Sequence, residues 1–299
     1  EDEEMKDVGV KEFADKKNYD EKLAASLEYR IPTGQKEAFV TFLIRYLCIS
    51  TSRWSSTDLG RRALSVLYDS TQLWSEINIP LVIFERFLLT NDLNSGNFSI
   101  LGYCWNTLEV LGITLENKDS EWIINNLKAL QRLLIKVIKT HNHDLQEVLQ
   151  RVLRIILKAI TEESYEDSEP EDVKNFMNLL ISVISSDLGN TASLAAGITL
   201  FSTVTYYQPE RLTPLIPSII KTFGKLCKDH VTITMTQKIS QENSTQVEEE
   251  ARMTAKLLSK ILDFATIRIS YFGDHRRIFL SILAQFIERS YDKDLSKHI

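Results

Sequence analysis

The sequence predicts an all-α protein built as an array of helical hairpins, and three observations indicate this class. The 299 residues include only 10 Gly and 6 Pro, well below the usual ~7% and ~5%, whereas folds rich in strands need many turns. Apolar residues recur at spacings of three and four through most of the chain, which is the helical period. Several segments are apolar nearly all round, so we expect neighbouring helices on two of their sides.

The N-terminal part is expected to contain an acidic, partly disordered leader over residues 1–34, followed by two helices. The chain starts with Glu1 rather than Met, so we expect it to be cut from a longer protein. The segment 35–50 carries one apolar stripe, made of Phe39, Phe42, Leu43, Tyr46 and Leu47. The segment 57–70 opens with a Thr-Asp capping signal, and its apolar positions are Leu59, Ala63, Val66 and Leu67.

The next two segments, 79–90 and 97–115, are predicted to form a hairpin with TNDLNSGN as its turn. One apolar row of the second helix holds Ile100, Cys104 and Leu111, and an adjacent row holds Leu101, Trp105, Leu108 and Leu115. The partners expected from the first helix are Ile83, Phe84 and Phe87. This spacing assigns Cys104 and Trp105 to buried helix packing rather than to a binding pocket.

Seven further segments have helical patterning, which brings the expected total to about eleven helices. They are 119–140, 143–160, 170–189, 190–207, 209–231, 247–272 and 274–290. The start and stop signals are clearest in 170–189, which has Pro at its first turn, acidic residues next to it and Gly189 at its end. The buried residues expected in 119–140 are Trp122, Ile123, Leu127, Leu130, Leu134 and Val137. The polar stretches near 161–172 and 236–246 are expected to be mobile loops.

The helices follow one another in pairs, at a period of about 35–45 residues that fits HEAT or armadillo-like repeats. The stretch PERLTPLIPSIIKTFGKLCKDH has a HEAT-like pattern, with an early Pro followed by Leu and Ile at helical spacing. The predicted fold is therefore an α-solenoid over residues 35–299. No strict letter-for-letter period is present, so a compact helical bundle is the alternative.

Charge and cysteine content exclude several classes of function. The net charge of −6 gives no global attraction to nucleic acid or to an anionic membrane. The three cysteines, Cys48, Cys104 and Cys227, lie far apart in apolar runs, which favours a reducing compartment over a disulfide framework. No apolar run approaches the ~18 residues of a membrane span, and no signal peptide is visible.

The most enzyme-like feature is the sequence HNHD at 141–144. His141 and His143 are two residues apart, a spacing that points them to different faces of a helix, and a metal site would need further ligands. We interpret the segment as a turn in which His and Asp cap the helix ends. The cysteines have no His nearby in the sequence to act as a base, so their expected role is packing.

Two charged features could meet a partner. The segment EESYEDSEPED has seven acidic residues and no basic one, and its expected state is a solvated loop, with an acidic docking loop as the alternative. Small basic spots occur at Arg53, Arg61, Arg62, Arg276 and Arg277, where ion pairs on a solvated helix face are expected. No phosphate-binding loop, nucleophile elbow, kinase signature or zinc pattern is present, so no catalytic, cofactor or metal residue is assigned.

The helix order, together with scattered matches, resembles the helical solenoid of the TRRAP family. The matched residues are Trp74, Phe84, Leu88, Leu89, Asn97, Leu108, Glu109, Val110, Leu111, Pro209 and Arg289, within roughly 35–295. That family comprises pseudokinase scaffolds of histone acetyltransferase coactivator complexes, and its fungal counterpart belongs to SAGA. The resemblance implies a nuclear, non-catalytic scaffold segment that contacts other subunits and acidic activation domains. It transfers no partner-binding residue individually.

Two other classes share parts of this pattern. A nuclear transport receptor or a phosphatase scaffold has the same repeat physics, so the fold alone cannot separate these from a coactivator scaffold. An enzyme would require a convergent polar pocket, for example one metal held by His141, His143 and carboxylates. No small-molecule substrate or membrane contact is expected.

Overall fold

The computed structural model describes residues 30–89, 93, 97–163, 165, 168–239 and 244–289. In this part of the chain all regular structure is helical, which confirms the all-α prediction, with twelve α-helices where about eleven were expected. The acidic leader predicted for 1–34 lies almost entirely outside the described residues. Among the described residues, no helix is both long and apolar enough to cross a membrane.

The helices pair into successive hairpins. The first helices of these pairs are α2 (Thr33–Cys48), α4 (Val82–Leu88), α7 (Leu127–Ile138), α9 (Glu171–Leu188), α11 (Ile216–Ile239) and α13 (His275–Arg289). The second helices are α3 (Asp58–Leu73), α5 (Phe98–Glu116), α8 (His143–Glu162), α10 (Leu194–Tyr207) and α12 (Ser244–Arg268). The helix α6 (Ser120–Asn125) precedes α7, and three short 3₁₀ segments are η1 (Trp54–Ser56), η2 (Pro209–Leu215) and η3 (Ile269–Phe272).

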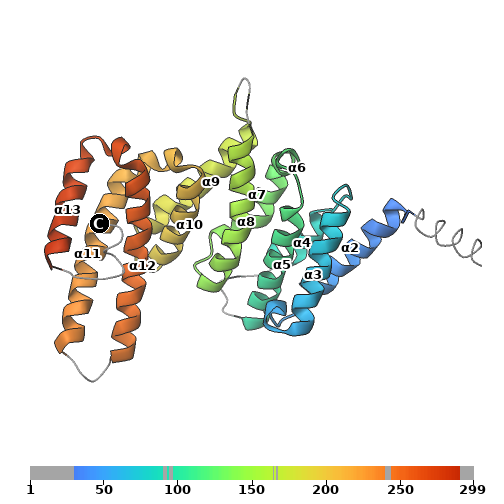
Figure 1. Cartoon of the computed structure of the whole chain (residues 1–299), viewed down its shortest axis with the longest axis horizontal. Helices are drawn as coiled ribbons and strands as arrows, with labels where there is room; N and C mark the ends of the chain where they lie inside the picture. The colour runs from blue at the N-terminus through green and yellow to red at the C-terminus, as the bar shows by residue number, and fades with distance from the viewer. Residues whose placement is uncertain are drawn as a thin grey trace, which may run out of the picture.

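The hairpins stack into two layers, as Figure 1 shows along the long axis of the molecule. In the first layer α2 packs against α4, and contacts continue in order through α7, α9 and α11 to α13. In the second layer α3 packs against α5, followed by α8, α10 and α12. Each repeat therefore contacts mainly its neighbours, the arrangement that defines a solenoid.

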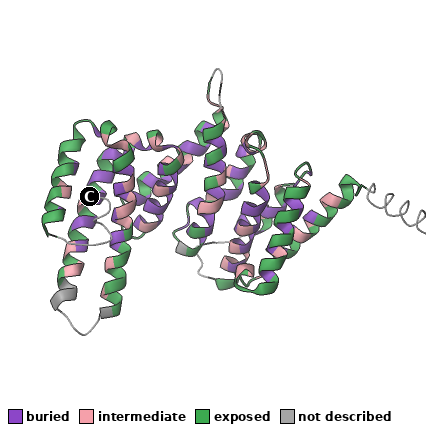
Figure 2. Cartoon of the chain, viewed as in Figure 1, coloured by how far each residue is buried: buried purple, intermediate pink, exposed green. Residues whose placement is uncertain are grey.

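Burial explains why the central helices are apolar on most of their surface. The helices α5 and α10 each pack on a hairpin partner and on second-layer neighbours at both sides. Most residues of α5 from Asn106 to Leu115 are buried, as are most of α10 from Leu194 to Thr205. Figure 2 shows these buried stretches between the layers, whereas α2 and α13 at the two ends are largely exposed.

Capping side chains start several helices where the sequence indicates. Thr57 accepts a hydrogen bond from the backbone N–H of Gly60 at the start of α3, as the Thr-Asp signal predicts. Asp119 caps α6 in the same way through Trp122. At α9, Pro170 precedes the first turn and Gly189 follows the last, so both expected boundary signals are confirmed.

The structure corrects three helix boundaries. The segment 119–140 is two helices that meet at Asn126, whose side-chain amide and backbone N–H both donate to the carbonyl of Trp122. The helix α11 continues to Ile239 and α12 begins at Ser244, so most of the loop predicted at 236–246 is helical. The polar stretch 161–172 fits better, since α8 ends at Glu162 and α9 begins at Glu171.

The apolar stripes of the first two helices are only partly buried. In α2 the buried residues are Val40, Ile44, Leu47 and Cys48, whereas Phe39, Phe42 and Tyr46 are exposed, Phe42 by 66%. In α3 the residues Leu59 and Val66 are exposed, and Leu64 and Leu67 are buried. Helix α2 has two apolar stripes, of which one packs on α3 and α5, whereas Phe39 and Tyr46 of the other only reach the rings of Trp74 and Trp54.

A close contact holds the loop that joins α2 to α3 against α5. The side-chain amide of Asn106 donates to the carbonyls of Ser50 and Ser52, at 2.8 and 2.9 Å. A Cβ atom at Gly102 would lie 2.0 Å from the carbonyl oxygen of Thr51, so the glycine permits this approach. The loop before η1 is therefore held rigidly over α5.

Candidate interaction surface

A groove with a volume of about 780 Å³ lies between α11 and α13. Aromatic contacts set the distance between these helices. The ring of Phe223 on α11 lies 4.7 Å from that of Phe279 on α13, and His230 lies 5.9 Å from Phe286. Phe223, Phe279 and Phe286 are buried. Their packing forms the bottom of the groove.

The groove has an apolar floor and a basic edge. Its floor is lined by Pro217, Ile220, Gly224, Cys227, Val231, Ile278, Ile282 and Phe286. The basic groups beside it are Lys221, Lys225, Lys228, Arg289 and the imidazole of His275. Thr232 and Gln285 complete the lining, and no acidic residue is among the residues that form it. An apolar floor with a basic edge suits a ligand that is apolar on one side and anionic on the other.

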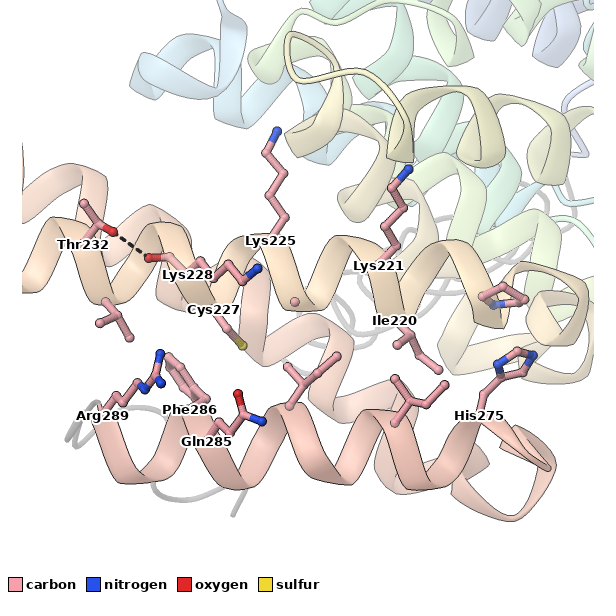
Figure 3. A pocket seen from close by; sticks show the side chains of 15 residues that line it. Ile220, Lys221, Lys225, Cys227, Lys228, Thr232, His275, Gln285, Phe286 and Arg289 are labelled. Atoms are coloured by element: carbon pink, nitrogen blue, oxygen red, sulfur yellow. Dashed lines mark hydrogen bonds between the residues drawn. The ribbon is translucent and has the colours of Figure 1, made fainter.

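Figure 3 shows how these side chains lie. Ile220 and Cys227 point from α11 towards α13, and Gln285 and Phe286 point back from α13 towards α11. Lys221 and Lys225 extend along the far side of α11, away from α13, and the amine of Lys225 donates to the hydroxyl of Thr191 at 3.1 Å. Lys228 and Arg289 are therefore the cations placed nearest to one end of the apolar floor.

The cysteines have the packing role that the sequence predicts. Cys48, Cys104 and Cys227 are free thiols and all are buried. Burial raises the pKa of each thiol to about 12. A thiol with so high a pKa is almost entirely protonated near neutral pH and is a poor nucleophile.

The prediction for Trp105 is only partly right. Helix α5 does pack on α4, where the ring of Phe87 lies 5.9 Å from that of Tyr103. Trp105 is half-buried, and the guanidinium of Arg53 lies 3.8 Å above its ring. Sequence spacing could not identify this cation–π contact, because Arg53 comes from the loop that Asn106 holds over α5.

The HNHD segment joins α7 to α8, with His143 and Asp144 in the first turn of α8, and its capping residue differs from the predicted one. Asn142 caps α8 by accepting a hydrogen bond from the N–H of Leu145. Asp144 instead forms an ion pair with Arg53, and His141 is exposed. Among the described residues, no three His, Cys, Asp or Glu side chains are grouped so that they could hold a metal ion.

The charged segments are partly bound to the protein surface. In the acidic segment, Glu169 forms an ion pair with Arg211 of η2, and Tyr165 packs against the core, where burial raises the pKa of its hydroxyl. A wholly solvated loop is therefore an incorrect description. Of the basic spots, Arg61 pairs with Asp58, and Arg276 donates to the carbonyls of Ile269 and Ser270.

Sequence reasoning missed the groove itself. Its signals were present as three lysines at 221, 225 and 228 and as apolar residues on the segment 274–290. Neither signal shows alone that α13 comes to lie beside α11. That contact depends on the tertiary packing of Phe223 on Phe279.

Comparison with known proteins identifies the family. The model of the Tra1 HEAT repeat ring region matches residues 1–299. A relative named "SAGA complex/NuA4 acetyltransferase complex subunit TRA1" from Saccharomyces cerevisiae is 43% identical over 268 residues, which cover 88% of this chain. The subunit named Tra1 of the same complexes from Schizosaccharomyces pombe is 26% identical over 265 residues, also 88% of this chain.

A more distant relative is a probable transcription-associated protein 1 from Dictyostelium discoideum, 26% identical over 132 residues, 44% of this chain and 3% of its own length. The chain spans 7% of the length of each of the two yeast relatives. The family match over the full chain agrees with the stacked hairpins and with the TRRAP-type helix order seen in the sequence. The chain belongs to the Tra1 HEAT repeat ring family.

Proposed function

We propose that this chain is a non-catalytic scaffold segment of a nuclear transcription coactivator that organises a histone acetyltransferase complex. The family match and the names of the two yeast relatives support this role. Residues 35–299 would act as one stretch of a longer repeat array. Exposed apolar side chains on the first and last described helices, such as Phe42 on α2 and Leu280 on α13, support this continuity.

Within this role, the groove between α11 and α13 is the docking surface for an acidic activation domain of a transcription factor. The observation that carries the assignment is the combination of an apolar floor with a basic edge that has no acid. An amphipathic helix with Leu or Phe on one side and Asp or Glu on the other would place its apolar side in the groove. Its carboxylates would then lie beside Lys228 and Arg289.

A binding titration tests this assignment. The probe is a fluorescein-labelled peptide in which Leu and Phe alternate with Asp and Glu at helical spacing, added to the 299-residue chain. Ile278 lines the groove and is 54% exposed, so Ile278→Ser should preserve the fold and weaken binding about fivefold through lost apolar contact. The matched control is Leu280→Ser, on the same helix and 47% exposed, but outside the groove.

The two variants give clear alternatives. Equal binding by both variants and by the unmodified chain would refute the groove as the docking surface. Equal loss in both would show general disruption of α13 and would count against it as well, with circular dichroism reporting the helix content.

The match to the Tra1 family favours this function over a nuclear transport receptor or a phosphatase scaffold, which have similar repeats. The proposal gives the segment no reaction and no cofactor. Other subunits would dock along the remaining ridges and grooves of the two layers.

A further inference from the structure

A second surface, in the opposite layer from the groove, holds three cations that form no ion pair with an acid among the described residues. Helix α10 lies between α8 and α12 in the layer of second helices. Arg154 lies on α8 and is exposed, and Lys256 and Lys260 lie one turn apart on α12. We call these three residues the Lys260 patch. The whole of α10, from Leu194 to Tyr207, contains no Asp, Glu, Lys or Arg.

Lys260 is the centre of this patch. Its side chain is half-buried, and its amine donates one hydrogen bond to the hydroxyl of Thr199 on α10, at 2.9 Å. The charges that act on this amine are those of Lys256 and Arg154, and both repel it. The Arg154 guanidinium contacts only the neutral amide of Gln150, at 3.4 Å. An ammonium group has three donors, so Lys260 retains capacity for an anionic acceptor.

Nearby cations on the same part of the molecule show the contrast. Arg151 pairs with Glu116 at 2.9 Å, and Lys158 pairs with Glu162 at 3.6 Å. Arg268, further along α12, pairs with Glu210 of η2 at 3.8 Å. The chain as a whole has an excess of acids, with a net charge of −6. Among the described residues, no ion pair joins Arg154, Lys256 or Lys260 to an acid, so the Lys260 patch is a local excess of positive charge on a chain that is acidic overall.

We infer that the Lys260 patch binds an acidic segment of a partner protein through carboxylates. The cations stand on two helices that pack on either side of α10, and this spread suits an elongated chain of several carboxylates better than one small ion. Each carboxylate would accept charge-assisted hydrogen bonds from a lysine or from the arginine. The site differs from the groove between α11 and α13, because its neutral floor is α10 and its binding rests on charge alone.

The patch also predicts a pH dependence of this binding. Burial, with smaller contributions from Lys256 and Arg154, lowers the pKa of Lys260 to about 8. The ammonium form is therefore lost as the pH rises through about 8. Since only that form attracts a carboxylate, affinity should fall between pH 7 and pH 9.

A peptide titration at low ionic strength tests the inference. The probe is a fluorescein-labelled peptide of ten glutamates, added to the 299-residue chain. The triple variant Arg154→Gln/Lys256→Gln/Lys260→Met should bind about tenfold more weakly, because several partly exposed ion pairs are lost together. The matched control is Lys174→Gln, an exposed cation on α9 in the other layer, which should leave the affinity unchanged.

The variant Lys260→Arg separates the inference from general charge effects. A guanidinium stays protonated across this range, so this variant should keep its affinity at pH 9 while the unmodified chain loses about half or more. Equal binding by the triple variant, or the same pH profile in Lys260→Arg, would overturn the proposal. Displacement of the peptide by inorganic phosphate, but not by chloride at equal ionic strength, would also overturn it in favour of a phosphate site.

The outcome is independent of the activation-domain assignment. Ile278→Ser removes a groove contact and should not change binding of the glutamate peptide. Loss of glutamate-peptide binding in Ile278→Ser would mean that the groove, rather than the patch, holds the acidic chain.

Discussion

The groove between α7 and α9 and the groove between α11 and α13 occupy equivalent places in the first layer, yet their surfaces differ. The α7–α9 groove, of about 690 Å³, is lined by Lys128, Gln131, Arg132, Ile135, Asp172, Asn175, Asn178, Leu179 and Ser182. Two of these are apolar, and both signs of charge are present. The α11–α13 groove, of about 780 Å³, has a mainly apolar lining and only basic charges.

Different residues therefore determine how the repeats pack and what chemistry the groove surfaces have. Both pairs of helices use buried apolar residues to pack, as α9 does with Phe176 and α11 with Phe223. The outward positions are not needed for packing, so they can be polar in one groove and apolar in another. Exposed apolar surface beside polar groups marks an interaction site, and this property distinguishes the α11–α13 groove.

The largest expected effect comes from removing the aromatic packing beneath the α11–α13 groove. Both Phe223→Ala and Phe176→Ala should cost about 3–5 kcal/mol, since each deletes a fully buried ring. The two variants should differ in which helices are destabilised, because among the described elements α13 contacts α11 and η3 on one side only. In Phe223→Ala, hydrogen exchange should therefore accelerate first in α13, ahead of the central helices. Exchange in α13 no faster than in α7 would contradict this.

A smaller effect on stability is expected when a lysine is replaced, and its size should differ between the two layers. At pH 7, Lys260→Met should stabilise the fold by about 1–2 kcal/mol, since one pKa unit corresponds to ~1.4 kcal/mol and solvent screens part of the shift. The exposed Lys228→Met at the groove edge should change stability by less than about 0.5 kcal/mol. Chemical denaturation measures both values.

The sign of the pH dependence follows from the direction of the shift. The pKa of Lys260 is about 8 in the folded chain and has an ordinary value of 10.5, so the unfolded chain binds more protons between these values. Stability of the unmodified chain should therefore rise with pH across this window. The gain from Lys260→Met is complete below about pH 8 and disappears by about pH 10.5. A gain that is constant with pH would contradict the proposed burial of the ammonium group.

The smallest expected effect is a gain of peptide binding when the α7–α9 groove is given the lining of the α11–α13 groove. Asp172→Asn, Asn175→Leu and Asn178→Leu together give the α7–α9 groove an apolar floor without an acid. In the Ile278→Ser background, this change should recover binding of the amphipathic peptide about threefold, through new apolar contact. Fluorescence anisotropy measures the recovery, and the single change Asp172→Asn is the control. No recovery would show that groove geometry, as well as lining, decides binding.

How much of this could be predicted differs between the fold and the site. Helix type and order were predictable because the apolar period is local, and capping by Thr57 and Asp119 followed from single residues. The exposure of Phe42 was not predictable, because α2 carries two apolar stripes and the sequence does not show which one meets α3 and α5. The break at Asn126 was hidden within a continuous apolar pattern.

The sites depend on contacts between distant parts of the chain. Lys221, Lys225 and Lys228 are visible as a basic stripe, but the floor beside them exists only when α13 packs on α11. The Lys260 patch joins α8 to α12 across α10, so Arg154 and Lys260 come together from far apart in the sequence.

By itself the sequence determined the helices, their pairing into hairpins and the absence of recognisable catalytic motifs, because helical period and caps act over a few residues. The tertiary structure alone decided which apolar stripes are covered, where the α11–α13 groove opens and how three cations gather over α10. Stacking hides identical kinds of side chain at the centre of a solenoid and leaves them exposed at its ends and grooves. Burial and local charge therefore depend on how the repeats stack, and one repeat alone does not determine them.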